Sequence, residues 1–227
     1  MICMNQIMLH GRCGMIKCII FDVDGTLVDS SFGLFDSFSY ASKIVGLKAP
    51  EKSIFRKSIG PPIDKIFNNF YKDKSHLKEN FIKSFRKHYD NKGYLGYKKK
   101  FDLKKLEGIK NKNIYLGIVT NKPSMPTKNI LKDMSLIDMF NMVTCKDTYN
   151  ISYDKKDNLK KIISVIKQKI TISDSEFVYV GDTLEDFDAA NHCEISFAAI
   201  SDGFYKWKSF SGKNIYPSLD NFLEIHL

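Results

Sequence analysis

Two aspartates in the stretch KCIIFDVDGTLVDSS, residues 17–31, are the first side chains in the sequence that could carry out chemistry. Asp22 and Asp24 directly follow a run of four apolar residues and are separated by one valine. Side chains two positions apart on an extended chain point to the same side, so we expect the two carboxylates to lie close together. Their mutual repulsion becomes tolerable when a divalent cation lies between them.

A second acidic cluster occurs far along the chain, in VGDTLEDF, residues 180–187. Asp182 ends another apolar run, and Asp186 follows about one helical turn later. Oxygen ligands without histidine or cysteine favour Mg²⁺. Asp22, Asp24 and Asp182 are therefore candidate Mg²⁺ ligands. The position of Asp186 is compatible with a carboxylate that only stabilises the first turn of a helix.

The elements that must position these residues are short apolar runs, which alternate with helix-like patterns. The runs are residues 16–21, 114–119, 142–145, 177–180 and 195–200, and helical periodicity marks residues 158–170 and 184–193. This alternation predicts an α/β fold with a parallel sheet covered by helices on both faces. The polar clusters DVDGT, TNKPS and GDTLED follow three of the runs. Ligands bind beyond the carboxyl ends of such strands, so we predict an active site there.

One interval is too long for a simple crossover between strands. The 92 residues between Phe21 and Ile114 compare with about 25–30 in an ordinary connection. Apolar residues recur at helical spacing there, for example Phe81, Phe85 and Tyr89. We therefore expect a helical cap domain at 30–95, inserted into a core formed by 16–29 and 96–227. Residues 1–15 are expected to be an N-terminal extension with little structure, with Met15 as an alternative start.

Composition restricts the class of protein further. Hydrophobic residues make up 43% and charged residues 27%, which is ordinary for a soluble globular protein. No apolar run approaches the roughly 20 residues of a membrane helix, so we expect no membrane partner. The five cysteines lack paired spacing, which predicts reduced thiols in the cytoplasm.

The net charge of +9 is carried almost entirely by lysines spread along the chain, with only three arginines. Arginine is the better residue for bidentate recognition of phosphates and bases. We therefore expect no nucleic-acid partner, but rather faster encounter with small anionic substrates. The sequence leaves the oligomeric state open.

These motifs resemble those of the haloacid dehalogenase (HAD) superfamily of phosphohydrolases. DVDGTLVDS is similar to the first motif of that superfamily, VTNKP to the second and GDTLED to the fourth. SIGPP at 58–62 and DGF at 202–204 extend the likeness over most of residues 16–205. The chain most resembles the phosphoglycolate-phosphatase-like branch with a helical cap. The resemblance implies a Rossmann-like core with an inserted α-helical cap, and Mg²⁺-dependent hydrolysis of a small phosphorylated metabolite.

The resemblance also implies roles for the acidic residues. Asp22 would be the nucleophile that forms an aspartyl-phosphate intermediate. Asp24 would be the general acid toward the leaving group and then the base for water. The Mg²⁺ ion would be held by Asp22, the backbone carbonyl of Asp24 and Asp182. Asp186 would orient these metal ligands.

Other motif positions would bind the substrate. Gly25 would leave room for it, and Thr26 would fix the loop by a hydrogen bond. Thr120 would offer its hydroxyl to the phosphoryl oxygens, beside the backbone N–H of Asn121.

The third motif of the superfamily is a phosphate-binding lysine, which falls in YDKKDNLKKI at the start of a predicted helix. The likeness selects Lys155, because Leu159 four residues later can then pack on the inward side; Lys156 is the alternative. Proline often follows this lysine in the family but is absent here. Glu194 occupies a point where the family often has glycine.

Other functions on the same fold remain open at this point. A phosphomutase would use the same residues but return the phosphoryl group to a sugar phosphate, and a non-catalytic binding protein needs none of them. Asp24 argues against a dehalogenase, which lacks this acid–base aspartate. Arg56, just before SIGPP, is a cation that either meets a second anionic group of the substrate or lies on the surface.

Overall fold

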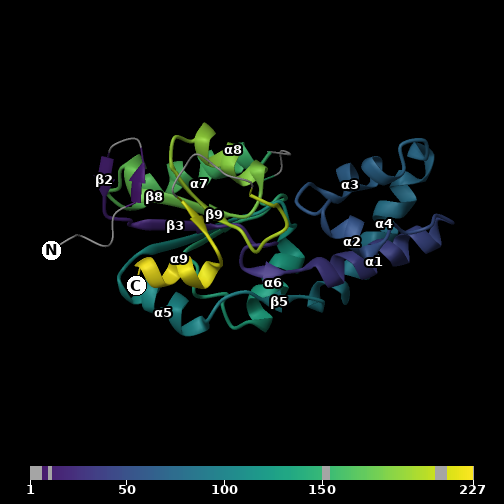
Figure 1. The fold of residues 1–227 in the computed structure, drawn as a ribbon, viewed down its shortest axis with the longest axis horizontal. Coiled ribbons are helices and arrows are strands. Elements are labelled where there is room, and N and C mark those ends of the chain that lie inside the picture. Colours follow the sequence, from purple (N-terminus) through teal and green to yellow (C-terminus); the bar gives the residue numbers. More distant parts are fainter. Residues whose placement is uncertain (1–6, 10–11, 150–153, 208–213, 227) are drawn as a thin grey trace.

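The structure is a computed structural model that describes residues 7–9, 12–149, 154–207 and 214–226. Its centre is a parallel sheet of six strands in the order β10-β9-β8-β3-β6-β7 (Figure 1). This architecture confirms the predicted α/β fold. The strands are β3 (Cys18–Phe21), β6 (Tyr115–Val119), β7 (Met142–Thr144), β8 (Phe177–Gly181), β9 (Ser196–Ile200) and β10 (Ile215–Tyr216).

Helices cover both faces of the sheet, which explains why its strands are almost continuously apolar. One face carries α7 (Lys155–Lys169) and α8 (Leu184–His192). The other carries α5 (Leu103–Asn111), α6 (Ser124–Asp133) and α9 (Leu219–His226) (Figure 1). The side chains of β3 alternate between the two faces. Ile19 and Phe21 pack on the face covered by α5, α6 and α9, whereas Cys18 and Ile20 pack on the face covered by α7 and α8.

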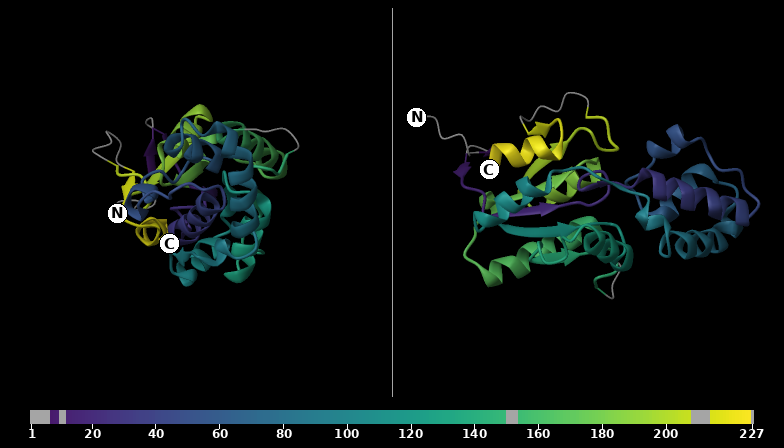
Figure 2. Two further views of the ribbon diagram at one scale, coloured as in Figure 1. Left: turned by 90° about the vertical axis from the view of Figure 1, so that its right-hand side faces the viewer. Right: turned by 90° about the horizontal axis from the view of Figure 1, so that it is seen from below.

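A helical unit, residues 31–95, projects from one end of the sheet (Figure 2). It has its own core, which consists mainly of aromatic rings that bury a large apolar area per residue. Phe38 lies at its centre, with its ring 4.8 Å from the rings of both Phe55 and Phe81. The helices of the unit are α1 (Ser31–Ile44), α2 (Lys52–Arg56), α3 (Ile63–Phe70) and α4 (Lys78–Tyr89), with 3₁₀ turns η1 (Ser75–Leu77) and η2 (Gly93–Leu95).

Two short strands connect the helical unit to the sheet. β4 (Val28–Asp29) carries the chain out and β5 (Lys98–Lys99) carries it back, and the two pair antiparallel. The connection begins seven residues after the end of β3, so the unit is held at the carboxyl edge of the sheet. Phe204, from a loop of the core, packs into the aromatic core of the unit.

The N-terminal segment has more regular structure than the sequence predicts. Strands β1 (Ile7–Leu9) and β2 (Arg12–Gly14) pair antiparallel, although little structure is expected there. Only two residues separate the strands, so the pairing is local and has a low entropic cost. Glu194 has φ of 55°, a left-handed conformation that explains why glycine suits this position between helix and strand.

No helix within the described ranges is long and apolar enough to cross a membrane. Cys18, Cys145 and Cys193 are free thiols. The remaining regular element is the 3₁₀ turn η3 (Asp174–Glu176) before β8.

Candidate active site

The carboxyl ends of three neighbouring strands bring the candidate residues together. Asp22 follows β3, Thr120 follows β6 and Asp182 follows β8. β3 lies between the other two strands, and Phe21 is in register with both Ile118 and Val180. The three polar side chains are buried at this edge.

Asp22, Asp182 and Asp186 form a buried cluster in which one oxygen of each carboxylate lies within 4.8 Å of the others. The pKa of Asp22 is raised to about 7, chiefly because the carboxyl group is buried; Lys155 acts to lower it, whereas Asp186 and Asp24 act to raise it. Burial and the neighbouring carboxylates also raise the pKa of Asp182. A cation bound among these oxygens would relieve the repulsion.

The charge balance of the site also favours a bound cation. Four carboxylates lie beside two lysine ammonium groups, which leaves an excess of two negative charges when all are ionised. The carboxylates are those of Asp22, Asp24, Asp182 and Asp186, and the ammonium groups are those of Lys122 and Lys155. An all-oxygen donor set with this excess fits a hard divalent cation.

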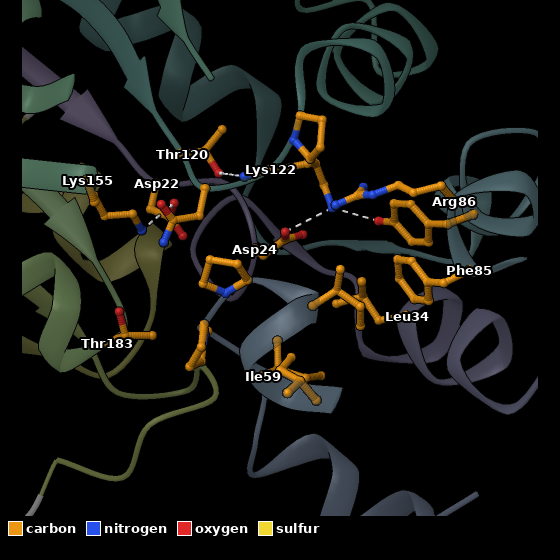
Figure 3. A pocket seen from close by; sticks show the side chains of 18 of the residues that line it. Asp22, Asp24, Leu34, Ile59, Phe85, Arg86, Thr120, Lys122, Lys155 and Thr183 are labelled. Carbon is orange, nitrogen blue, oxygen red and sulfur yellow. Dashed lines mark hydrogen bonds and ion pairs between the residues drawn. The ribbon is translucent and has the colours of Figure 1, made fainter. Parts of the chain in front are cut away.

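Lys155 is the lysine that reaches this cluster. Its Nζ atom lies 3.1 Å from Asp22 Oδ1 (Figure 3). The same atom lies 2.6 Å from Asp186 Oδ1. Burial alone would lower the pKa of Lys155, but Asp186 and Asp22 outweigh it and hold the pKa above its usual value. Lys155 is the first residue of α7, and Asp154 caps this helix by accepting a hydrogen bond from the N–H of Asp157. Lys156 makes no ion pair in the described part of the chain.

Asp186 forms hydrogen bonds through both of its carboxylate oxygens. Its Oδ2 accepts hydrogen bonds from the N–H and hydroxyl of Thr183, which closes the first turn of α8. Its Oδ1 accepts from Lys155 and from the hydroxyl of Tyr179 at 3.0 Å. With both oxygens engaged by the protein, Asp186 is placed to orient Lys155.

The loop after Asp22 fits closely against Asp182. Gly25 has φ of 88°, and a Cβ atom there would lie 2.1 Å from Asp182 Oδ2. Only glycine therefore fits this position without displacing the carboxylate. Asp182 also accepts a hydrogen bond from the N–H of Phe204 at 2.6 Å and a longer one, 3.4 Å, from the hydroxyl of Thr26.

Thr120 and Asn121 line the same cavity as Asp22. The Thr120 hydroxyl oxygen accepts a hydrogen bond from the N–H of Lys122 at 3.2 Å. The Asn121 side chain donates to Glu185 at 3.0 Å. The Thr120 hydroxyl oxygen and the Asn121 side chain are therefore held in place by local contacts.

Lys122 is a buried lysine that the sequence analysis did not single out. Its Nζ lies 2.8 Å from Asp24 Oδ2 and donates a hydrogen bond to the hydroxyl of Tyr89 at 2.6 Å (Figure 3). Burial alone would lower the pKa of Lys122, but Asp24 and Tyr89 outweigh it and the pKa is raised. The sequence signal that could have identified Lys122 is its position in TNKP, two residues after Thr120.

The cavity lies between the core and the helical unit, with a volume of about 70 Å³. Its wall from the helical unit is mostly apolar and includes Arg86 as a cation, which the sequence analysis also missed. The residues from the helical unit are Leu34, Phe55, Ile59, Gly60, Pro61, Pro62, Ile63, Ile66, Phe85, Arg86 and Tyr89.

Arg56 does not line this cavity. It donates two hydrogen bonds to Asp29 and one to Ser31, and it stacks over the ring of Phe204. It therefore joins the helical unit to its connecting strand and to a loop of the core.

Comparison with known proteins places these features in a family. The sequence matches the haloacid dehalogenase-like hydrolase family over residues 19–200. Phosphoglycolate phosphatase of Aquifex aeolicus (strain VF5) is 26% identical over 195 residues, covering 86% of this chain and 89% of that protein. Pyrophosphatase PpaX of Oceanobacillus iheyensis is 26% identical over 193 residues, covering 82% and 84%. The crystal structure of a predicted phosphatase from Clostridium acetobutylicum has the same fold, with a TM-score of 0.82 at 22% identity over 93% of this chain and 98% of that one.

Proposed function

The chain belongs to the haloacid dehalogenase-like hydrolase family, and from this premise we propose that it is a phosphatase acting on small phosphate monoesters. Relatives named phosphoglycolate phosphatase and pyrophosphatase support phosphoryl chemistry. The observation that carries the proposal is the contact between Asp22 and Lys155. Asp22 follows β3, which lies between β6 and β8, and the Lys155 ammonium group at the start of α7 is 3.1 Å from it. A nucleophile for phosphorus and a cation for the phosphoryl oxygens thereby face one cavity.

In the first half-reaction, an oxygen of the Asp22 carboxylate attacks phosphorus while the bond from phosphorus to the leaving oxygen breaks. The product is an aspartyl-phosphate at Asp22. Asp24 in its acid form gives its proton to the leaving oxygen, which departs as an alcohol. Lys155 and the Thr120 hydroxyl stabilise the negative charge on the other phosphoryl oxygens.

In the second half-reaction, water attacks phosphorus and gives a proton to the Asp24 carboxylate. The bond between phosphorus and Asp22 breaks, which releases inorganic phosphate and restores both aspartates. Asp24 therefore ends each cycle protonated and ready for the next substrate, so no outside acid or base is required.

We propose Mg²⁺ as the cofactor. The buried carboxylates of Asp22 and Asp182 and the backbone carbonyl of Asp24 would hold it, with Asp186 supporting the site through Lys155. When bound, Mg²⁺ supplies positive charge to the phosphoryl oxygens. Its fit rests on the two unbalanced negative charges and the raised pKa of Asp22.

The size of the cavity supports small substrates. Its volume of about 70 Å³ is well below the roughly 300–1,000 Å³ of pockets for drug-sized ligands. The helical unit walls it on one side and restricts access for macromolecules. We therefore expect phosphoglycolate, sugar phosphates or similar esters to be hydrolysed faster than phosphoproteins.

Hydrolysis of para-nitrophenyl phosphate tests the proposal. We expect turnover with Mg²⁺, loss of activity in excess chelator and recovery when Mg²⁺ is restored, with Ca²⁺ a poor substitute because its looser geometry misplaces the reacting oxygens. Full activity in excess chelator would disprove the metal site. Failure to hydrolyse this ester and a panel including phosphoglycolate, pyrophosphate, a sugar phosphate and a nucleoside monophosphate would disprove the phosphatase.

A further inference from the structure

The ammonium group of Lys122 occupies the boundary between the core and the helical unit. Its side chain is only 2% exposed, and it follows Thr120 on the core side. One contact is to Asp24, also in the core, and the other is to Tyr89 at the end of α4 in the helical unit. The side chain also passes over the Tyr89 ring, with Nζ 4.7 Å from the ring centre.

The two oxygens of Asp24 have different surroundings. Oδ2 is held by Lys122 at 2.8 Å, whereas Oδ1 is buried and has no hydrogen-bond partner among the described residues. A buried carboxylate oxygen without a donor is unfavourable unless a further group completes it. Asp24 lines the cavity, so we expect an oxygen of the bound substrate to complete Oδ1.

Tyr89 is itself rigidly placed. It is 1% exposed, and its ring stacks on that of Phe85 with the centres 5.4 Å apart and the planes 8° from parallel. The hydroxyl can therefore reach Lys122 only while α4 lies against the core. Asp24, Lys122 and Tyr89 thus form a chain of contacts that depends on the arrangement of the two units.

We propose that Lys122 is a positioning residue that fixes Asp24 for proton transfer when the helical unit is in place. By holding Oδ2, Lys122 leaves Oδ1 directed to the leaving group, and Tyr89 makes this orientation depend on α4. The inference rests on the proposed function, because it assigns a use to the proton that Asp24 transfers.

Leaving groups of different basicity separate this role from a general structural one. The para-nitrophenolate ion is a stable leaving group that needs little protonation, whereas an alkoxide from ethyl phosphate needs a proton as it departs. Lys122→Met should therefore lower kcat on ethyl phosphate by at least about tenfold more than on para-nitrophenyl phosphate, a modest share of the usual contribution of a general acid. Asp24→Asn should show the same selectivity.

Two further variants complete the test. Tyr89→Phe keeps the buried ring and should give a smaller loss with the same selectivity, which also covers the case in which Lys122→Met folds poorly. Lys146→Met is the matched control, since Lys146 makes an exposed contact between the units, 3.8 Å from Asp64. It should leave the ratio of the two rates unchanged. Equal loss on both esters for Lys122→Met and Tyr89→Phe, or no loss, would overturn the positioning role.

Hydrogen exchange gives a readout that does not depend on catalysis. The peptide at the end of α4, which contains Phe85 and Tyr89, should exchange faster in Lys122→Met, whereas Lys146→Met should leave it unchanged. Unaltered exchange there would contradict the link to the helical unit. If the wild-type protein hydrolyses neither these two esters nor any member of the substrate panel described above, the proposed phosphatase is wrong, and the exchange result still decides whether Lys122 holds α4 against the core.

Discussion

Lys155 and Lys122 are both buried lysines paired with an aspartate of the loop after β3, yet their surroundings differ. Lys155 contacts Asp22 and Asp186, and all three residues belong to the sheet core. Lys122 contacts Asp24 in the core but also Tyr89 in the helical unit. The first cluster is therefore complete within one unit, whereas the second requires two.

This difference separates the two stages of chemistry that the site would perform. Asp22, the proposed nucleophile, is preorganised by core contacts alone, which would lower the cost of orientation during reaction. Asp24, the proposed proton donor, is held in part through a helix of the other unit. Binding of substrate beneath the helical unit can therefore be coupled to proton transfer without disturbing Asp22.

The largest effect on activity is expected from removing the ammonium group of the core cluster, which consists of Asp22, Lys155 and Asp186. Lys155→Met should lower kcat/KM by at least about tenfold, or roughly 1.4 kcal/mol, because the phosphoryl oxygens lose their fixed positive charge. Lys156→Met is the matched control on the next residue and should change little. Steady-state kinetics on para-nitrophenyl phosphate measures both, and a silent Lys155→Met would mean that the site obtains its cation elsewhere.

Tyr179 and Tyr89 allow us to compare how much each cluster contributes to the free energy of unfolding. Tyr179→Phe should lower the free energy of unfolding by about 1–3 kcal/mol, because the Asp186 carboxylate loses a buried donor. The Val119 carbonyl oxygen, 2.9 Å from the same hydroxyl, is the second acceptor that shares this single proton and loses it too. Urea unfolding of the metal-free protein gives this value. If Tyr179→Phe loses no more unfolding free energy than Tyr89→Phe, the hydrogen bonds of the core cluster do not stabilise the protein more than the contact between Lys122 and Tyr89.

Tyr89→Phe should cost less, about 0.5–1.5 kcal/mol, since Lys122 keeps its ion pair with Asp24. The ring remains buried in the aromatic core, so packing is preserved. The same urea titration measures it beside Tyr179→Phe. A larger loss for Tyr89→Phe would show that the contact between the units carries more of the stability than the structure suggests.

The smallest effect is expected at the partly exposed contact of Arg56 with Asp29. Partial burial alone would raise the pKa of Asp29, but hydrogen bonds from Ser31 and Arg56 outweigh it and lower the pKa. Because the carboxyl pKa is lower in the folded state, the pair stabilises the fold above the ordinary aspartate pKa of about 3.9 and loses this contribution as the pH falls through the folded value.

Arg56→Met should accordingly cost about 0.2–1 kcal/mol at neutral pH, as expected for a partly exposed pair. The difference from wild type should shrink in unfolding experiments at acid pH. A difference that grows on acidification would contradict the ion pair as its cause.

Much of the fold was predictable because its signals are local. The apolar runs predicted five of the six strands of the sheet, and only the two-residue strand Ile215–Tyr216 was too short to stand out. Asp22 and Asp182 were identifiable because each directly follows a strand. The antiparallel pairing of Ile7–Leu9 with Arg12–Gly14 was missed, since three-residue strands give little periodicity.

The contact between the units was not predictable from spacing. Tyr89 is 33 residues from Lys122 in the sequence, and its apolar periodicity indicates only a buried helix position. Its contact with the ammonium group depends on how α4 is placed against the core. For the same reason the sequence left Arg56 open between a substrate contact and a surface position and did not point to Arg86, which lines the cavity.

The most direct test of the central claim is to look for the phosphoryl group on Asp22 during turnover. A single turnover of para-nitrophenyl phosphate, quenched in acid and digested, should yield a peptide containing Asp22 that carries one added phosphoryl group by mass spectrometry. Asp22→Asn should lack this peptide and retain less than about a hundredth of the activity. Product formation without phosphorylation of Asp22, or with the phosphoryl group on another residue, would contradict the account.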